Sequence, residues 1–121
     1  MYETLTSTGQ FSTQGIYFDQ GSDVIKPESG PTLQQIAQLL SDHPNLKIII
    51  EGHTDNQGDA EENQKLSEVR AAAVKQKVVD AFGADGSRIE TVGFGSSKPA
   101  VPNKSATSMA QNRRVTLRER K

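Results

Sequence analysis

The chain of 121 residues contains no cysteine and no tryptophan, and it has no long apolar run. Without cysteine it can form no disulfide, no thiolate metal site and no thiol nucleophile. No stretch approaches the about 20 apolar residues that a membrane-spanning helix requires, and no hydrophobic signal segment follows Met1. We therefore expect Met1 to begin one domain of a longer protein, with any targeting signal elsewhere in that parent.

Strong net charge is also lacking. The formal net charge is -1, so the chain as a whole is not expected to bind polyanions. Six of the basic residues gather in residues 104–121, where Glu119 is the only acid. With two tyrosines and four phenylalanines, the chain has few aromatic side chains on which nucleic acid bases could stack. The basic end is better explained as a solvated edge strand, and no nucleic acid partner is expected.

Two helices are predicted by apolar residues that recur at intervals of three and four. The first runs from Thr32 to about Asp42 and follows two prolines, which the first turn of a helix tolerates. The second runs from about Ala60 to Phe82, and Gly83 follows as a natural left-handed C-terminal residue. One further helical turn is expected over residues 107–112.

Short apolar or alternating runs predict four core strands, over residues 15–18, 46–50, 88–94 and 113–118, and an edge strand over residues 10–13. The order of strands and helices predicts an α/β (α+β) fold, a mixed sheet with the helices packed on one face. Right-handed crossovers would place the loops 19–29 and 51–62 at the same rim of the sheet, where open α/β sheets bind ligands. We divide the chain into an N-terminal extension, residues 1–15, and one domain, residues 16–121.

Arg70 is the strongest candidate for a functional residue. It lies on the apolar side of the second helix, between Ser67 and Val74. A guanidinium on that face needs a partner, because burying it unpaired costs several kcal/mol. Two interpretations remain open: a structural ion pair with Asp55 or Asp19, and a bidentate clamp on the carboxylate of a ligand.

Asp55 follows the strand 46–50, beside Thr54 and Asn56. Its side chain is expected either to close an Asx turn in the loop or to receive an ammonium group, and a carboxylate has enough lone pairs for both. Asn63, at the start of the second helix, is either a cap or a polar contact. An acid at the end of a strand and a base on the next helix suggest a receptor for a small zwitterion.

Other chemistries find less support. His53 and Asp55 lack a third metal ligand at suitable spacing. No Gly-x-Ser-x-Gly motif occurs, and Gly93-Phe94-Gly95 lacks the third glycine of a dinucleotide-binding loop. We therefore expect no metal, no cofactor and no catalysis.

Several motifs occur in order along the chain: Phe18-Asp19, Ile25-Lys26-Pro27, Glu51-Gly52-His53-Thr54-Asp55-Asn56-Gln57-Gly58, Asn63-x-x-Leu66-Ser67-x-x-Arg70-Ala71, Gly93-Phe94-Gly95, Pro99 and Asn112-Arg113-Arg114-Val115. Together they resemble the OmpA-like C-terminal domain, a family that includes the peptidoglycan-associated lipoprotein and the MotB stator domain. The resemblance covers about residues 16–118. Before Ile16 it is weaker, and we assign that stretch no function.

The resemblance implies a periplasmic domain of the βαβαβ type that binds cell-wall peptidoglycan without covalent attachment. It would anchor an outer-membrane protein, an inner-membrane protein or a lipoprotein to the wall. The implied ligand is the diaminopimelate of the stem peptide, whose free end carries an ammonium and a carboxylate on one carbon. The resemblance assigns the ammonium to Asp55 and the carboxylate to Arg70. It places flanking hydrogen bonds and the pocket rim at Asn63, Thr54, the backbone of Asp23-Val24-Ile25, and Arg113.

The chain departs from the family at Ser108-Met109, where Gly-Arg commonly precedes the Ala-x-Asn-Arg-Arg motif. The loss of that positive charge is expected to affect local packing or glycan contacts. Two alternatives stay open. One is a stator or assembly module that acts mainly through a homodimer. The other is a wall amidase or peptidase. It is less favoured, because no nucleophile–base pair or metal triad can be assembled from the sequence.

Overall fold

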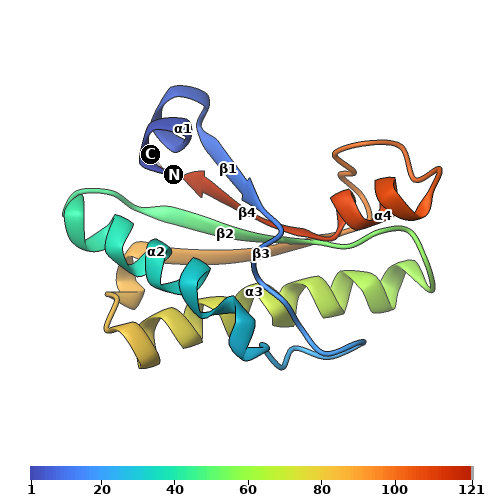
Figure 1. Cartoon of the computed structure of the whole chain (residues 1–121), viewed down its shortest axis with the longest axis horizontal. Helices are drawn as coiled ribbons and strands as arrows, with labels where there is room; N and C mark the ends of the chain where they lie inside the picture. Colours follow the sequence, from blue (N-terminus) through green and yellow to red (C-terminus); the bar gives the residue numbers. More distant parts are fainter. Residues whose placement is uncertain (121) are drawn as a thin grey trace.

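A four-stranded mixed sheet organises the computed structural model, which describes residues 1–120 (Figure 1). Its strands stand in the order β1–β4–β2–β3. β2 and β3 run parallel, and β4 lies antiparallel between β1 and β2. The strand bounds are β1 Gln10–Thr13, β2 Ile48–His53, β3 Ile89–Gly95 and β4 Arg114–Glu119.

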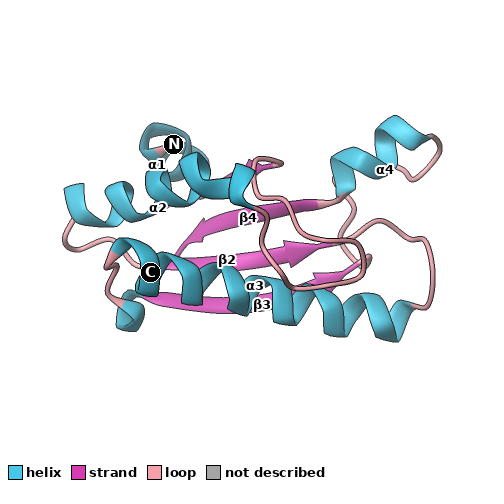
Figure 2. Ribbon diagram, turned by 60° about the horizontal axis from the view of Figure 1, so that its bottom comes forward, coloured by secondary structure: helices cyan, strands magenta, loops and turns pink. Residues whose placement is uncertain are grey.

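Two long helices, α2 (Gly30–Asp42) and α3 (Ala60–Phe82), pack on one face of this sheet (Figure 2). The shorter helices α1 (Tyr2–Thr8) and α4 (Ala106–Asn112) lie at opposite ends of the molecule (Figure 1). Short 3-10 turns precede α2 and β3, over Pro27–Ser29 and Gly86–Arg88. The predicted fold class, a mixed sheet with helices on one face, is confirmed. No helix in the described part of the chain is long and apolar enough to cross a membrane.

The ends of α3 follow from local chemistry. Asp59 caps its N-terminus, because the Asp59 side chain accepts a hydrogen bond from the Glu62 backbone N–H at 3.1 Å. Gly83 ends the helix with a φ of 73°, in the left-handed region that favours glycine. The predicted bounds of this helix are confirmed at both ends.

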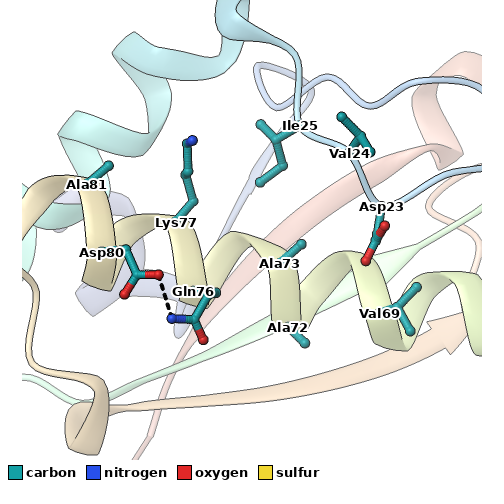
Figure 3. A pocket seen from close by; sticks show the side chains of 10 residues that line it. All are labelled: Asp23, Val24, Ile25, Val69, Ala72, Ala73, Gln76, Lys77, Asp80 and Ala81. Atoms are coloured by element: carbon teal, nitrogen blue, oxygen red, sulfur yellow. Dashed lines mark hydrogen bonds between the residues drawn. The ribbon is translucent and has the colours of Figure 1, made fainter.

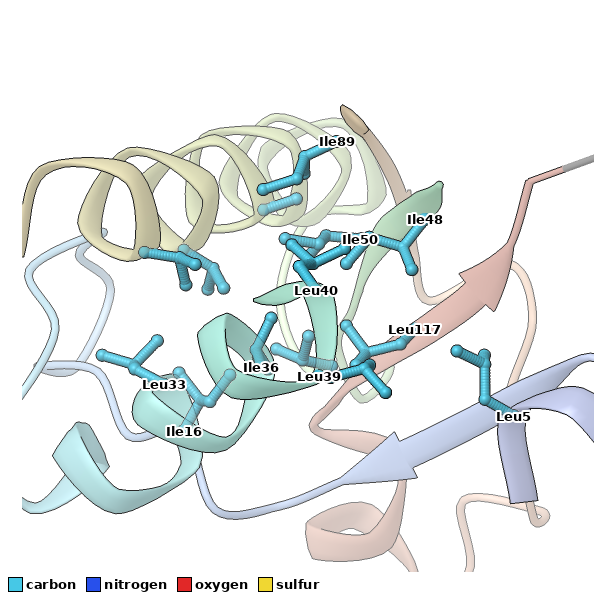
Figure 4. Packing of buried hydrophobic residues seen from close by; sticks show 14 of the residues in the cluster. Leu5, Ile16, Leu33, Ile36, Leu39, Leu40, Ile48, Ile50, Ile89 and Leu117 are labelled. Atoms are coloured by element: carbon cyan, nitrogen blue, oxygen red, sulfur yellow. The ribbon is translucent and has the colours of Figure 1, made fainter. Parts of the chain in front are cut away.

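The hydrophobic core lies between the two long helices and the sheet (Figure 4). Each fully buried aliphatic side chain there contributes on the order of 2 kcal/mol of transfer free energy. The members with no more than 2% exposure include Leu5, Leu33, Ile36, Leu40, Ile48, Ile50, Val74, Val78, Ile89 and Leu117. Leu5 belongs to α1, so the N-terminal residues contribute to this core.

The predicted strand over residues 15–18 is wrong. Phe18 forms only an isolated bridge with Ile25. The Tyr17 backbone is used locally, since its N–H donates to the Ser29 hydroxyl (2.7 Å) and its carbonyl accepts from the Lys26 N–H (2.8 Å). The predicted edge strand over residues 10–13 is confirmed as β1. This strand, and not residues 15–18, is the first strand of the sheet, where it pairs with β4 at the edge.

Two further elements differ from expectation. β2 continues through Glu51, Gly52 and His53, which are buried although the sequence placed them in a loop. Helix α1 was not predicted, because its sequence is rich in threonine and serine and buries only Leu5. In both places, contacts with distant segments decide the structure, and local hydrophobic periodicity does not reveal them.

Candidate functional site

Arg70 lies on α3 with a half-buried side chain that reaches the loop after Phe18. Its Nε–H donates to the Ser22 carbonyl oxygen at 2.8 Å, and one terminal NH2 group donates to the Asp19 carbonyl oxygen at 3.3 Å. The guanidinium carbon lies 4.7 Å from the centroid of the Phe18 ring, a cation–π contact. Arg70 therefore holds the loop over residues 18–25 against α3.

The positive charge of Arg70 is not neutralised by an ion pair within residues 1–120. A structural ion pair with Asp55 or Asp19, one of the two interpretations left open by the sequence, is not formed, because Arg70 contacts the backbone of Asp19 and not its carboxylate. Burial lowers the pKa of the guanidinium, and the negative charge of Asp23 offsets part of that shift. Two neutral carbonyls thus fix the position of the guanidinium while leaving its charge available to an anion.

Loop residues 18–25 form a tight, self-bonded turn under Arg70. The Asp19 N–H donates to the Val24 carbonyl at 3.0 Å, and the Val24 N–H donates to the Ser22 hydroxyl at 3.0 Å. Gly21 takes a φ of 65°, which the turn requires and which side chains disfavour. The family resemblance implied that the Asp23-Val24-Ile25 backbone offers hydrogen bonds to the ligand, but this fold uses both backbone groups of Val24 within the loop.

Asp55 is 7% exposed and follows the end of β2. One carboxylate oxygen accepts the Gln57 backbone N–H at 3.0 Å, which is the predicted Asx turn. The other accepts a hydrogen bond from Arg113, whose side chain is half-exposed. Arg113 was expected at the pocket rim, and its role as the partner of Asp55 was not predicted.

Thr54 and Asn63 stabilise the same loop. The Thr54 hydroxyl donates to the Asp55 carbonyl at 2.9 Å, and its backbone N–H donates to the Gly95 carbonyl at 2.8 Å. The Asn63 side-chain amide donates to the Gln57 carbonyl at 2.8 Å. Asn63 does not cap α3, a role that Asp59 takes. Both residues therefore fix the backbone on either side of Asp55.

α3 brings Arg70 alongside the sheet near the end of β2, since Gly52 packs directly against Ser67, one helical turn before Arg70. Within residues 1–120, Asp55 and Arg70 form no hydrogen bond or ion pair with each other. Each is held by its own partners. The two charges are therefore not locked together, which is one condition for a receptor that accepts a ligand between them.

An open groove of about 740 Å³ lies between the loop and the outer side of α3 (Figure 3). Val24 and Val69, which are 56% and 45% exposed, give it an apolar lip. Asp55 and Arg70 are not among its lining residues, which are Asp23, Val24, Ile25, Val69, Ala72, Ala73, Gln76, Lys77, Asp80 and Ala81. The groove is thus a neighbour of the predicted site and not the site itself.

A second charged cluster, missed by the sequence analysis, lies on the sheet face opposite α3. Glu51 accepts hydrogen bonds from Arg118 Nε–H at 2.6 Å and from His53 Nε2 at 3.1 Å. Burial disfavours the Glu51 carboxylate, but the hydrogen bonds from Arg118 and His53 outweigh it and hold its pKa below the ordinary value. The signal was present as a period of two, since Glu51 and His53 alternate with inward-facing Ile50 and Gly52.

The sequence matches a known protein family and several of its members. The model of the OmpA family matches residues 17–113. The chain is 40% identical over 100 residues to outer membrane protein Omp38 of Acinetobacter baumannii, a match that covers 83% of this chain and 28% of Omp38. It is 37% identical over 115 residues to a peptidoglycan-associated lipoprotein of Buchnera aphidicola, covering 95% of this chain and 65% of that protein. The chain thus spans only part of the length of these relatives.

Solved structures agree with the sequence matches. The crystal structure of the peptidoglycan-associated lipoprotein from Burkholderia pseudomallei superposes with a TM-score of 0.77 at 36% identity, covering 90% of this chain and 89% of that one. The cell wall anchor of the T6SS from Pseudomonas aeruginosa superposes with a TM-score of 0.74 at 25% identity, covering 96% and 90%. Fold and sequence therefore point to the same family.

Proposed function

Because the chain belongs to the OmpA family, we propose that it binds cell-wall peptidoglycan without covalent attachment and anchors a protein of the cell envelope to the wall. The names of its relatives support this proposal, since they include outer membrane proteins, peptidoglycan-associated lipoproteins and a cell wall anchor. We place the domain in the periplasm, joined to a membrane through other parts of its parent. None of these names denotes an enzyme.

The ligand that we propose is the free end of diaminopimelate in the stem peptide. The observation that carries this is the half-buried Arg70, which neutral carbonyls hold in place without neutralising its charge. A guanidinium fixed in this way has further N–H donors for a carboxylate. The planar fork of donors of an arginine matches the two oxygens of a carboxylate better than the ammonium group of a lysine would. Arg70 therefore takes the ligand carboxylate.

The ligand ammonium then binds Asp55. Each carboxylate oxygen of Asp55 already accepts one hydrogen bond, from Gln57 and from Arg113, and each keeps a free lone pair. Arg113 is half-exposed and can turn toward solvent when the ammonium enters. Thr54 and Asn63 hold the loop around Asp55, and the flanking hydrogen bonds come from the backbone of Asp23 and Ile25.

Affinity for one stem peptide is expected to be modest. A single site with two charge pairs and a few hydrogen bonds gives dissociation constants of roughly micromolar to millimolar. Peptidoglycan presents many copies of the same peptide, so a parent protein with several such domains, or many copies in one membrane, holds the wall by avidity.

The test compares Arg70→Ala with a matched control, Arg88→Ala. Arg88 also donates to two distant backbone carbonyls, those of Leu46 and His43, but it precedes β3 at the opposite end of the sheet. The two changes remove similar structural contacts. We expect the Arg70→Ala variant to lose sedimentation with purified peptidoglycan while its circular dichroism spectrum remains that of a folded protein. The Arg88→Ala variant should sediment with peptidoglycan as the wild type does.

The same proteins, titrated with two muropeptides, test the ligand itself. A lysine-containing peptide keeps the ammonium of diaminopimelate but lacks its terminal carboxylate. The wild type should bind it at least tenfold more weakly than the diaminopimelate peptide, and Arg70→Ala should bind both equally weakly. A folded Arg70→Ala that sediments like the wild type would contradict wall binding at Arg70. Equal wild-type affinity for the two peptides would contradict the recognition of diaminopimelate but would leave wall binding itself intact.

A further inference from the structure

The sheet face that α2 and α3 leave uncovered carries a polar cavity of about 370 Å³. It lies over β1, β2 and β4 and is closed on one side by residues 98–100 of the loop that leads to α4. Its charged and titratable lining residues are Glu51, His53, Lys98, Arg114 and Arg118. Glu51, His53 and Arg114 belong to motifs of the family resemblance, but neither the resemblance nor the proposed function gives any of the five side chains a contact with the ligand.

One of the three cations is neutralised inside the protein. Arg118 donates to Glu51 through Nε–H at 2.6 Å, and one of its NH2 groups lies 3.5 Å from the other oxygen of that carboxylate. Glu51 is ionised, because its donors hold its pKa below the ordinary value against the effect of burial. The acid in the cavity is therefore committed to Arg118 and His53.

The other two cations have no carboxylate in contact within residues 1–120. Arg114 is half-buried and donates only to neutral carbonyls, that of Lys98 at 3.0 Å and that of Asn112 at 3.3 Å. The Lys98 ammonium lies 4.0 Å from the centroid of the Phe94 ring. Burial lowers the pKa of Arg114, with Glu51 opposing that shift. Two positive charges without an ion-pair partner thus face one small cavity, that of half-buried Arg114 and that of exposed Lys98.

His53 senses both of these charges. Its ring is buried and stacks on Phe94 with the centroids 5.4 Å apart. Burial lowers its pKa, and so do the positive charges of Arg114 and Lys98, against the opposing pull of Glu51. The ring is therefore neutral, its Nε2–H donates to Glu51, and Nδ1 has no partner within the described chain. An anion bound beside Lys98 and Arg114 would cancel their effect on this ring.

We propose that this cavity is a second ligand site, which takes a small oxyanion, a carboxylate or a phosphate group, between Lys98 and Arg114. Two cations without a carboxylate partner that converge on one cavity attract an anion more strongly than a single surface charge does, because both act on it at short range and Arg114 is half-buried. The site is independent of wall binding at Arg70, because Arg70 lies on α3, which packs on the opposite face of the sheet.

The experiment is an NMR titration of the whole chain with inorganic phosphate and, separately, with acetate, at ionic strength kept constant with chloride. We expect saturable shifts at the cavity residues and a higher His53 pKa at saturation with either anion. Phosphate should bind more tightly, because it brings more charge and more acceptor oxygens. Shifts with only one anion would assign the site to phosphate or to carboxylate ligands. No saturable shift with either anion would overturn the proposal.

Variants locate the site. Lys98→Gln and Arg114→Gln should each weaken anion binding about tenfold or more. Lys104→Gln removes the same charge from an exposed position in the same segment and should bind like the wild type. Arg70→Ala should also keep the response, which separates this site from the proposed wall site. If Arg114→Gln does not fold, Lys98→Gln decides, and an unchanged anion affinity in that variant would refute the assignment.

Discussion

Arg70 and Arg114 illustrate at the residue scale how a side chain can be fixed in place and still keep its charge. Each donates from a planar guanidinium to two backbone carbonyls: Arg70 to those of Asp19 and Ser22, and Arg114 to that of Lys98 and to that of nearby Asn112. A carbonyl supplies hydrogen-bond geometry without a net negative charge, so the guanidinium is positioned but not neutralised. That is why both arginines are suited to bind anions, whereas Arg118, paired with Glu51, is not.

His53 gives the fold a specific sensitivity to acid. Because its folded-state pKa lies below the ordinary histidine value of about 6.5, the unfolded chain takes up a proton below that pH before the folded chain does. The contribution of neutral, buried His53 to the free energy of unfolding is therefore fully present above a pH of about 6.5 and is lost as the pH is lowered. Urea denaturation at pH values of about 7.5, 6.5 and 5.5, which span the range in which histidine titrates, should show this loss of stability. The loss should be smaller in His53→Gln, which keeps an amide donor for Glu51. The same slope in both proteins would assign the acid sensitivity to other groups.

At the scale of elements, two glycines set the distance between α3 and the sheet. A Cβ at Gly52 would overlap the Ser67 carbonyl oxygen, and one at Gly93 would overlap the Glu68 backbone nitrogen. The close approach lets Gln64 donate to the Gly93 carbonyl at 2.6 Å and lets Ser67 accept the Gly95 N–H at 2.8 Å. These bonds clamp the first half of α3, which carries Arg70, to β3.

Gly52→Ala should therefore lower the free energy of unfolding by about 1–3 kcal/mol, because the new methyl group meets backbone that cannot yield locally. Whatever fold remains should also bind peptidoglycan more weakly, since α3 and Arg70 must shift outward. Gly86→Ala is the control, as its added Cβ would meet Val79 Cγ2 at an ordinary 3.4 Å, and its stability should change by at most about 0.5 kcal/mol. Urea denaturation measures both, and equal values for the two variants would show that the contact is not tight.

The sequence was sufficient for elements whose signals are local. The apolar spacing and Gly83 predicted α3, and alternation predicted β3 and β4 to within one or two residues. It failed where distant residues decide the outcome. Glu51 looked like part of a loop, because its burial depends on Arg118, 67 residues away. The candidate site shows the same limit: the sequence proposed Asp55 and Arg70 as candidates, but it did not predict Arg113 or the Ser22 carbonyl as their partners.

Considered as a whole molecule, the chain has a core that extends beyond the segment that matches the family. The match begins at residue 17, yet Leu5 of α1 is fully buried in the core. The Tyr2 ring stacks on His43 at the end of α2, with centroids 3.4 Å apart, and the Glu119 N–H of β4 donates to the Gly9 carbonyl at 3.0 Å. Residues 2–13 thus connect α2 and β4 at the end of the molecule opposite α4 (Figure 1).

Leu5→Ala tests whether these residues and the rest of the chain unfold as one unit. Removing a fully buried leucine side chain leaves a cavity, so we expect a loss of about 2–5 kcal/mol in the free energy of unfolding. Because the core is shared, the loss should appear as one cooperative transition shifted to lower temperature, with near- and far-UV circular dichroism coinciding. Thr4→Ala, at an exposed position of the same helix, should leave the midpoint nearly unchanged. A separate N-terminal extension would behave differently: Leu5→Ala would then add an early, small transition and leave the main midpoint where it is. Peptidoglycan binding should survive in Leu5→Ala below its melting temperature, because α1 lies far from the end of β2 where Asp55 is held.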